Sequence, residues 1–476
     1  MIITGRIAEQ KVLGLRLSTN EPELIAIYGR RRVGKTYLIR TFCNDSMVFE
    51  MTGIHEATMK TQLENFSQAL QLATQSVLPL TIPTTWLQAF MMLNTYLRSV
   101  PSDRAAVIFF DEFPWIDTHK SGFLQAFDHW WNASASKNSH LKVIICGSAA
   151  SWMINKIINN RGGLHNRVTQ TIRLLPFTLG ETQAYLRNKG VVLDLYSQLQ
   201  LYMAMGGIPY YLRNVNPGES TTQIIERLCF AKDGPLKNEF NNLYKSLFAH
   251  SENHERVIRV LADKAKGLTR NEIIDECGFT SGGTTTRILG ELEESGFITP
   301  YVPFQKRANE GLYKLSDEYS LFYLKFIEHA KDTEDGSWIR QYGTRAYMIW
   351  TGFAFESVCQ KHVSQIRRKL EIGGVLTNTA TWRHAPGKGA QGAQIDLLLD
   401  RQDHCINICE IKFSGSEFMI DKKYAMDLDN KVNVFRTETR TKKTLFLTMI
   451  TTYGVRKNEH YLGRIQAEVL MEDLFG

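Results

Sequence analysis

Three mainly apolar runs near the start of the chain have the length of buried strands: Leu24–Tyr28, Val107–Phe110 and Leu141–Cys146, the last of which contains Lys142. A strand that is covered on both faces shows no alternation of polar and apolar side chains, so these runs predict the centre of a parallel sheet. The segment Tyr37–Phe42, which follows the first run, is expected to be a helix. We therefore expect the first part of the chain to fold as an α/β domain.

Short helical patterns replace the apolar runs in the middle of the chain. Arg256–Leu261 is amphipathic, Thr269 followed by Glu272 predicts a capped helix start, and Thr284–Glu294 predicts a further helix. The stretch over residues 296–313 is expected to form a β-wing. This order of elements predicts a winged helix-turn-helix, a module that often reads the major groove of DNA.

The expected recognition helix is poorly suited to that task, because it offers Arg287 beside Glu291, Glu293 and Glu294. The DNA phosphates would repel these carboxylates. The pattern therefore favours a module that couples domains over one that reads a DNA sequence. The candidate DNA contacts lie in the wing and are Lys306 and Arg307.

A second strand pattern lies near the C-terminus, where Gln394–Leu399 and Cys405–Lys412 are joined by a polar turn. A turn of this length places Asp396 nearly opposite Glu410 in an antiparallel pair. The two-residue period of a strand places Glu410 and Lys412 on the same face. Three charged groups are therefore expected to converge within an apolar hairpin.

Composition and charge narrow the class of protein. The 476 residues favour about three domains, and the net charge of +7 permits nucleic-acid binding without requiring it. No apolar run is long enough to span a bilayer, and the N-terminus lacks the apolar core of a signal peptide. Seven scattered cysteines indicate reduced thiols. We expect a cytoplasmic protein with no membrane association.

The segment Gly29–Thr36 reads GRRRVGKT and fits the phosphate-binding pattern G-x-x-x-x-G-K-[ST]. Gly29 and Gly34 let the backbone curl so that its N–H groups point at a phosphate. Lys35 is expected to reach the β and γ oxygens, and the Thr36 hydroxyl is expected to contact Mg²⁺. The loop predicts ATP as the cofactor. Arg30, Arg31 and Arg32 within it could sense phosphate or an acidic neighbour, but the favoured interpretation is solvated loop charge.

Polar side chains follow the second and third apolar runs. Asp111 and Glu112 end the second run at the edge where α/β sheets bind ligands, so Asp111 is expected at the Mg²⁺ and Glu112 at the attacking water. Ser148 follows the third run and is expected to sense the γ-phosphate. Alone, Ser148 would indicate only a turn.

The C-terminal hairpin carries a second candidate chemistry. Burying unpaired ions costs several kcal/mol, which a divalent metal held by Asp396 and Glu410 would offset. Lys412 would then orient or help to deprotonate a metal-bound water. This is similar to the D…E-x-K layout of the PD-(D/E)xK nuclease fold, in which a preceding helix often donates a carboxylate. Glu356 is the expected donor, with Mg²⁺ or Mn²⁺ as the metal, and Tyr424 begins a helix near the substrate path.

The first half of the chain resembles the archaeal-type ATPases, a branch of the AAA+/STAND P-loop ATPases. The likeness rests on ordered motifs: TGRIAEQ, the P-loop, FFDEFPWID, CGSAASWM, RGGLHNRVTQTIRLLPF and MGGIPYYL. It implies that Arg6 and Glu9 lie near the adenine pocket and that Pro209 begins a lid helix touching the nucleotide. Arg167 stands where members carry an arginine finger that acts across a subunit interface, with an ordinary surface salt bridge as the equal alternative.

The resemblance also implies a homo-oligomer and a C-terminal domain of the nuclease type. The expected parts are a P-loop ATPase core at 1–175, a helical lid at 176–248, a winged helix-turn-helix at 249–335 and an α/β restriction-endonuclease-like domain at 336–476.

Three functions remain open. The leading hypothesis is an ATP-controlled, metal-dependent nuclease that cuts DNA, by analogy in defence against foreign DNA. The alternative is a nucleotide-switched DNA- or partner-binding protein whose nuclease fold is inactive. A translocating motor, which needs a ring of subunits, is the third.

Overall fold

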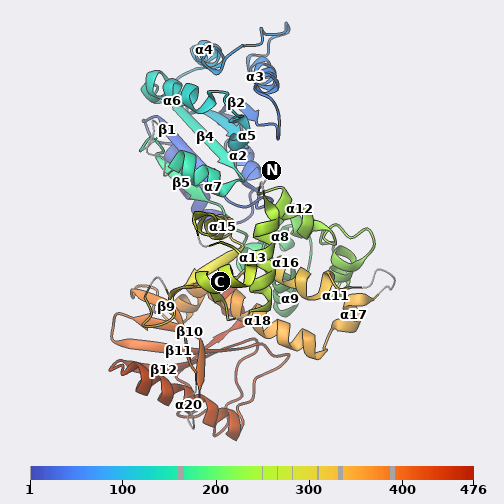
Figure 1. Cartoon of the computed structure of the whole chain (residues 1–476), viewed down its shortest axis with the longest axis vertical. Coiled ribbons are helices and arrows are strands. Elements are labelled where there is room, and N and C mark those ends of the chain that lie inside the picture. The colour runs from blue at the N-terminus through green and yellow to red at the C-terminus, as the bar shows by residue number, and fades with distance from the viewer. Residues whose placement is uncertain are drawn as a thin grey trace. The chain divides into compact units, whose positions relative to one another are not determined.

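The computed structural model divides into two compact units (Figure 1). The first comprises residues up to Pro176 with two short later segments, and the second comprises most of the chain from Phe177 onward. The described residues are 2–158, 164, 166–248, 250–264, 266–280, 282–307, 310–330, 336–385 and 392–476. The four-part division expected from the sequence stays a prediction.

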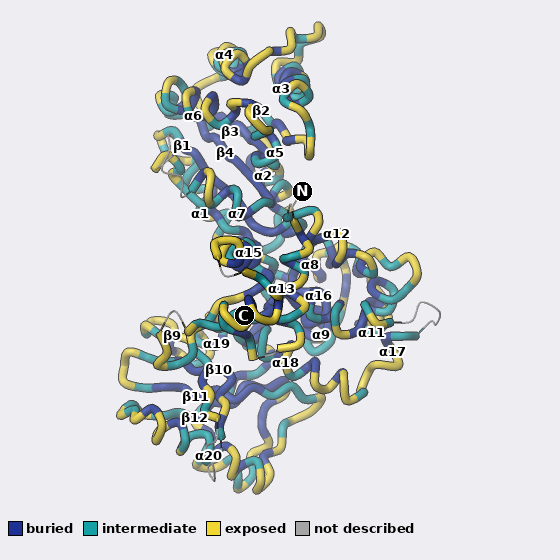
Figure 2. The backbone as a smooth tube through the Cα atoms, viewed as in Figure 1, coloured by how far each residue is buried: buried dark blue, intermediate teal, exposed yellow. Residues whose placement is uncertain are grey.

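The first unit is built on a five-stranded parallel sheet with strand order β2-β3-β4-β1-β5. Its three central strands are buried over their whole length, as their mainly apolar sequences predict (Figure 2). Since β4 lies between β1 and β3, their carboxyl ends are neighbours at one edge. The strands are β1 (Glu23–Tyr28), β2 (Met47–Thr52), β3 (Ala106–Asp111), β4 (Leu141–Gly147) and β5 (Gln170–Arg173).

Aromatic side chains dominate the core of this unit. The ring centroids of Phe90 and Trp130 lie 5.1 Å apart, and those of Trp86 and Phe123 lie 4.8 Å apart. Such pairs contribute about 0.5–1.5 kcal/mol each beyond the area that they bury. The helices are α1 (Ile7–Leu17), α2 (Lys35–Phe42), α3 (Met59–Thr74), α4 (Trp86–Leu97), α5 (Phe113–Ile116), α6 (Phe123–Ala133) and α7 (Ala150–Met153), with short turns η1 (Asn44–Ser46), η2 (Ala135–Lys137) and η3 (Ile154–Ile158).

The second unit begins with a group of helices. They are α8 (Leu179–Asn188), α9 (Leu195–Met205), α10 (Pro209–Leu212), α11 (Thr221–Ile225), η4 (Glu226–Phe230) and α12 (Glu239–Lys245). Gly207, between α9 and α10, makes a close backbone contact: its carbonyl accepts the Phe177 N–H at 2.7 Å. A Cβ at Gly207 would lie 1.9 Å from the Phe177 carbonyl oxygen, so only glycine fits this position of the MGGIPYYL motif.

Next come three helices and a small antiparallel sheet of order β6-β8-β7. The helix start predicted at Thr269 is confirmed. Thr269 Oγ1 accepts a hydrogen bond from the Glu272 N–H at 3.2 Å, and the Glu272 carboxylate accepts one from the Thr269 N–H. The elements are α13 (Ser251–Asp263), β6 (Leu268–Thr269), α14 (Arg270–Cys277), α15 (Gly283–Glu294), β7 (Ile298–Tyr301) and β8 (Leu312–Leu315).

The chain ends in a mixed five-stranded sheet of order β13-β12-β11-β10-β9. β10 is antiparallel to β9 and β11, while β11, β12 and β13 run parallel. α18 packs on β11 and α20 packs on β10 (Figure 1). The elements are α16 (Glu318–Phe322), η6 (Tyr323–Ile327), α17 (Ser337–Gln341), α18 (Arg345–Lys361), α19 (Val363–Lys369), β9 (Thr377–His384), β10 (Ala393–Arg401), β11 (Cys405–Lys412), α20 (Lys422–Thr439), β12 (Thr444–Thr451), β13 (Ala467–Leu470) and η7 (Met471–Leu474).

A buried histidine joins the first helix of this unit to α18. His362 Nδ1 lies 2.7 Å from the Val358 carbonyl oxygen, and His362 Nε2 lies 3.0 Å from the backbone nitrogen of Leu179, the first residue of α8. The network assigns the proton to Nδ1, since Nε2 must accept the Leu179 N–H. Burial lowers the pKa of His362 to about 4. The interaction therefore requires the neutral ring.

Acidification is expected to destabilise the protein through His362. The unfolded chain, with an ordinary histidine pKa near 6.5, binds the proton more tightly than the folded chain. The stabilisation is therefore complete above about pH 6.5 and is lost as the pH falls toward 4, with about 2 kcal/mol gone by pH 5. Urea unfolding at pH 7.5 and pH 5 measures this loss. His362→Gln, which cannot titrate, should have a smaller pH dependence, and an unchanged one would contradict the assignment.

Candidate functional site

The P-loop lies between β1 and α2, as predicted. Lys35 is the first residue of α2 and is 6% exposed, and its Nζ donates to the Gly29 and Arg30 carbonyl oxygens at 2.9 Å. Gly34, with φ of 91°, precedes the helix and provides no side-chain cap. The first-turn N–H groups of α2 therefore face the loop, an arrangement suited to an anion.

The acidic end of β3 lies beside the P-loop. Thr36 Oγ1 donates to Asp111 Oδ2 at 2.9 Å, which brings together the two residues predicted to contact Mg²⁺. Glu112 has φ of 45°, so the chain turns sharply after the strand. Glu112 Oε2 accepts hydrogen bonds from the Ser148 hydroxyl at 2.8 Å and from the Ser148 N–H at 3.2 Å. The predicted water-activating and phosphate-sensing residues are thus in direct contact.

Arg30 corrects the expectation that all three loop arginines are solvated, because it is only 2% exposed. Gly29 packs so closely on the segment after β5 that a Cβ there would lie 2.2 Å from the Leu174 carbonyl oxygen. This end of the loop is therefore covered by protein. Arg31 is half-buried, with its guanidinium 5.8 Å from the centroid of the Trp115 ring.

Arg6 and Glu9 lie against the P-loop. Arg6 is 4% exposed, its Nη2 donates to the Val33 carbonyl oxygen at 3.1 Å, and its Nη1 lies 3.8 Å from Glu9 Oε1. Contact with adenine stays a prediction. Arg167 is exposed in a turn before β5, and Pro209 is the first residue of α10 in the second unit. The finger and lid roles of these two residues stay predictions.

The second cluster forms around Glu410 on β11, which is 2% exposed. Its Oε1 accepts a hydrogen bond from the Tyr424 hydroxyl at 2.7 Å and lies 3.1 Å from Lys412 Nζ, which confirms that Glu410 and Lys412 share a face. Its Oε2 accepts a hydrogen bond from Lys431 Nζ at 2.6 Å. Burial acts to raise the pKa of Glu410, but Lys412 and Lys431 hold it below its usual value.

The predicted hairpin brings Asp396 next to this cluster. Leu397 pairs with Cys409, so Asp396 and Glu410 are the next positions toward the same end of the antiparallel pair. Asp396 is 9% exposed, and its pKa is raised by burial and then by the charge of Glu410. Burial and the charge of Asp396 raise the pKa of Glu356 on α18 to about 7. The four predicted residues therefore belong to one electrostatic site.

Two lysines of this site, Lys431 and Lys314, were not predicted from the sequence. Lys431 lies on α20, seven residues after Tyr424, so the two side chains share a helix face, a spacing that could have revealed it. Lys314 lies on β8 and interacts with the charges of Glu356 and Asp396. Burial lowers the pKa of Lys314, while these carboxylates oppose the shift. No local pattern marks Lys314, because its partners are far along the chain.

The donor atoms fit a divalent metal in kind but not in their present contacts. Carboxylate oxygens from Asp396 and Glu410 are the ligands that Mg²⁺ prefers. Both Glu410 oxygens, however, are used by Tyr424, Lys412 and Lys431. Within the described ranges, no group of at least three His, Cys, Asp or Glu side chains could hold a metal ion. A metal at Glu410 would therefore compete with these donors and would be repelled by the two ammonium groups.

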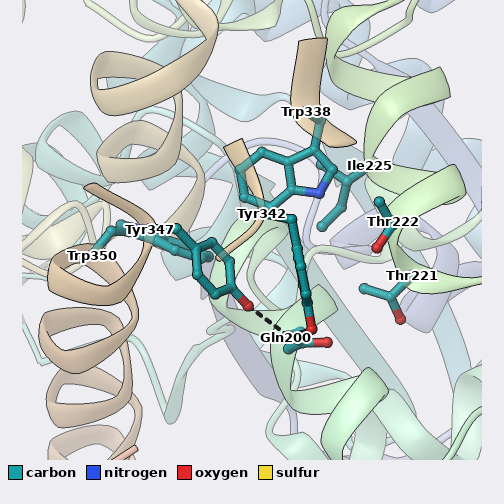
Figure 3. Close-up of a pocket in the computed structure, with 8 residues that line it drawn as sticks. All are labelled: Gln200, Thr221, Thr222, Ile225, Trp338, Tyr342, Tyr347 and Trp350. Atoms are coloured by element: carbon teal, nitrogen blue, oxygen red, sulfur yellow. Dashed lines mark hydrogen bonds between the residues drawn. The ribbon is translucent and has the colours of Figure 1, made fainter. Parts of the chain in front are cut away.

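A pocket elsewhere in the second unit offers no comparable chemistry (Figure 3). Gln200 Nε2 donates to the Tyr347 hydroxyl at 2.6 Å, and the rings of Tyr342 and Tyr347 lie 4.9 Å apart. The aromatic side chains thus pack on one another. The lining residues are Gln200, Thr221, Thr222, Ile225, Trp338, Tyr342, Tyr347 and Trp350.

The parallel sheet, the glycine-bearing loop and the acidic strand end define a P-loop nucleotide-binding fold. Residues 4–215 match the family described as an ATPase domain predominantly from Archaea, so the chain carries an ATPase domain of the archaeal type. An uncharacterized protein of Methanocaldococcus jannaschii is 24% identical over 439 residues, covering 90% of this chain and 92% of its own length. The family implies nucleotide binding.

A solved structure supports the fold. The Walker-type ATPase PABY2304 of Pyrococcus abyssi is similar with a TM-score of 0.50 and 19% sequence identity, over 68% of this chain and 96% of that one. At this identity the likeness shows the fold alone. Among the described helices, none combines the length and apolar character that crossing a bilayer requires.

Proposed function

We propose that the ATPase domain controls a metal-dependent DNA nuclease formed by the C-terminal sheet. The observation that carries this proposal is the convergence of Asp396, Glu410 and Lys412 on a buried strand pair, with Glu356 beside them. Two carboxylates whose charges repel one another in a buried site are costly for folding. A divalent cation between them would remove that cost, which gives the arrangement a chemical purpose.

The proposed nuclease roles follow from these contacts. Asp396 and Glu410 would hold Mg²⁺ or Mn²⁺, which supplies Lewis acidity toward a phosphodiester when bound. Lys412, beside Glu410, would orient the attacking water. The pKa of Glu356 is about 7, so this carboxyl can accept or release a proton near neutral pH.

The proposed ATPase roles use the first unit. Lys35 would leave the loop carbonyls to bind the β and γ phosphates of ATP, and Thr36 with Asp111 would hold Mg²⁺. Glu112 would polarise the attacking water, and Ser148 would orient Glu112 through their hydrogen bonds. Arg167 would complete this site in a homo-oligomer by acting across the subunit interface.

We further propose that the middle of the chain is a winged helix-turn-helix that couples domains. The helix and strand order from α13 to β8 supports this assignment. Arg287 is paired with Glu291 at 2.8 Å, which leaves less positive charge for DNA phosphates on the expected recognition helix. Lys314 lies on β8 and interacts with the charges of Glu356 and Asp396. It would therefore transmit movements of the small sheet to the nuclease site.

One contact favours the alternative of a nucleotide-switched binding protein. Lys431 occupies a Glu410 oxygen that a metal would need, as expected for a nuclease fold that has lost activity. In that case the C-terminal sheet binds DNA or a protein partner and does not cleave DNA. A cytoplasmic setting and a role in defence remain part of the proposal, and the seven free cysteines support the first.

DNA cleavage by the purified full-length protein tests this proposal. Plasmid and linear DNA are incubated with Mg²⁺ or Mn²⁺, with and without ATP, beside Lys35→Ala. We expect metal-dependent cutting whose rate or nucleotide dependence changes in Lys35→Ala, since the ammonium held by the P-loop is lost. DNA that is bound but never cut with either metal would establish the binding alternative. A cleavage rate that changes neither with ATP nor in Lys35→Ala would exclude control by the ATPase domain.

A further inference from the structure

Lys431 occupies the position that a metal ion needs at Glu410. Its Nζ lies 2.6 Å from Glu410 Oε2, on the side of the carboxylate opposite the Tyr424 and Lys412 contacts with Oε1. The Lys431 side chain is 22% exposed, whereas that of Glu410 is 3% exposed. The partly exposed Lys431 ammonium thus contacts the one Glu410 oxygen that neither Tyr424 nor Lys412 contacts.

The local charges explain how a cation and Lys431 would compete. Glu410 carries one negative charge and is in contact with the ammonium groups of both Lys412 and Lys431. A divalent cation placed on Oε2 would lie within contact distance of Lys431 and would be repelled by it. The Lys431 ammonium and a metal ion therefore compete for this oxygen, and each weakens the binding of the other.

The two lysines reach Glu410 from different elements. Lys412 lies on β11 itself, two residues after Glu410, so its place beside the carboxylate is set by the strand. Lys431 lies on α20 with Tyr424, which also binds Glu410. A displacement of α20 would therefore release Lys431 while Lys412 stays.

We propose that Lys431 is a resident counter-ion that competes with divalent metal at Glu410, and that release of Lys431 lets the site bind metal more tightly. This inference deepens the proposed nuclease function and rests on it for the identity of the metal site. It assigns a gating role to a residue of α20 that contacts neither the ATPase site nor, in this state, a metal.

Direct measurement of Mn²⁺ binding tests the inference without any DNA. Nucleotide-free full-length protein is titrated with Mn²⁺, and the free ion is followed by electron paramagnetic resonance. Lys431→Met is expected to bind Mn²⁺ about tenfold or more tightly than the parent, because the competing charge is gone. Adding Asp396→Asn to Lys431→Met should remove the gain. Lys423→Met is the matched control, since Lys423 is an exposed lysine on the same helix, and should bind Mn²⁺ like the parent.

Unchanged or weaker Mn²⁺ binding in Lys431→Met would overturn the inference. Circular dichroism shows whether this variant folds, and if it does not, Lys431→Gln takes its place, because an amide keeps the hydrogen bond without the charge. Tighter Mn²⁺ binding with no DNA cleavage would support the gate and contradict the nuclease. Cleavage by the parent, with Mn²⁺ binding unaffected by either Lys431 variant, would contradict the gate and leave the nuclease intact.

Discussion

Asp396→Asn is expected to lower the rate of metal-dependent DNA cleavage by about 10³-fold, since that factor corresponds to about 4 kcal/mol of lost metal-assisted stabilisation. Asparagine keeps the size of the side chain but removes the charge that would hold a cation beside Glu410. The loss should not come from unfolding, because Asp396 and Glu410 repel one another in the protein without metal. Cleavage of a labelled DNA duplex, with a melting curve on the same sample, separates the two effects.

Asp400→Asn is the matched control for this experiment. Asp400 lies on the same strand but is paired with Lys443 at 2.6 Å, away from Glu410. The same chemical change there should leave cleavage nearly as in the parent. If Asp396→Asn cuts as fast as Asp400→Asn, the C-terminal sheet does not hold the catalytic metal and the nuclease assignment is wrong.

Glu112→Gln is expected to lower the kcat of ATP hydrolysis by about 10²–10⁴-fold, the usual contribution of a general base. Binding of ATP should persist, because Lys35 and Thr36, which would contact the phosphates and Mg²⁺, are unchanged. The glutamine carbonyl can still accept the hydrogen bond that Ser148 donates to Glu112, so the loop should keep its shape. Steady-state phosphate release and calorimetric ATP binding give the two quantities.

Ser148→Ala separates orientation of Glu112 from its chemistry. This variant removes the hydroxyl that donates to Glu112 Oε2 but retains the carboxylate and the backbone hydrogen bond from residue 148. We expect a smaller loss of kcat than in Glu112→Gln. Full activity of Glu112→Gln would show that another group activates the water, and loss of ATP binding in it would show that Glu112 shapes the pocket.

The sequence predicts β1, β3, β4, β10 and β11 of the two larger sheets, but not β2, β5, β9, β12 and β13. The runs at Leu24–Tyr28 and Val107–Phe110 became β1 and β3 with one or two residues added, because burial on both faces favours apolar residues. Helices are predicted less completely. The helix expected to carry Glu356 is α18, whose start at Arg345 after the capping residue Thr344 was not predicted. Strand order in the sheets depends on distant segments and cannot be read locally.

The same distinction separates predicted from missed site residues. Asp396, Glu410 and Lys412 are within one hairpin, where the turn length and the strand period determine their neighbours. Lys431 and Lys314 reach the site from a helix and from another sheet, so their contacts depend on how those elements pack. The burial of Arg30 was not predicted either, and its neighbour Gly29 packs on Leu174, far beyond the loop motif.

The strand order of the first sheet also determines when the nucleotide site can form during synthesis. β1, which carries the P-loop, pairs with neither β2 nor β3, and its partners are β4 and β5. Glu23 pairs with Lys142 on β4, and Ile25 pairs with Gln170 on β5, so neither edge of β1 has a partner until these strands have been synthesised. A ribosome-bound chain that ends before β4 therefore contains the complete P-loop sequence but neither of the strands that pair with β1. Both edges of the strand that carries the P-loop can be paired only after β5 has been synthesised.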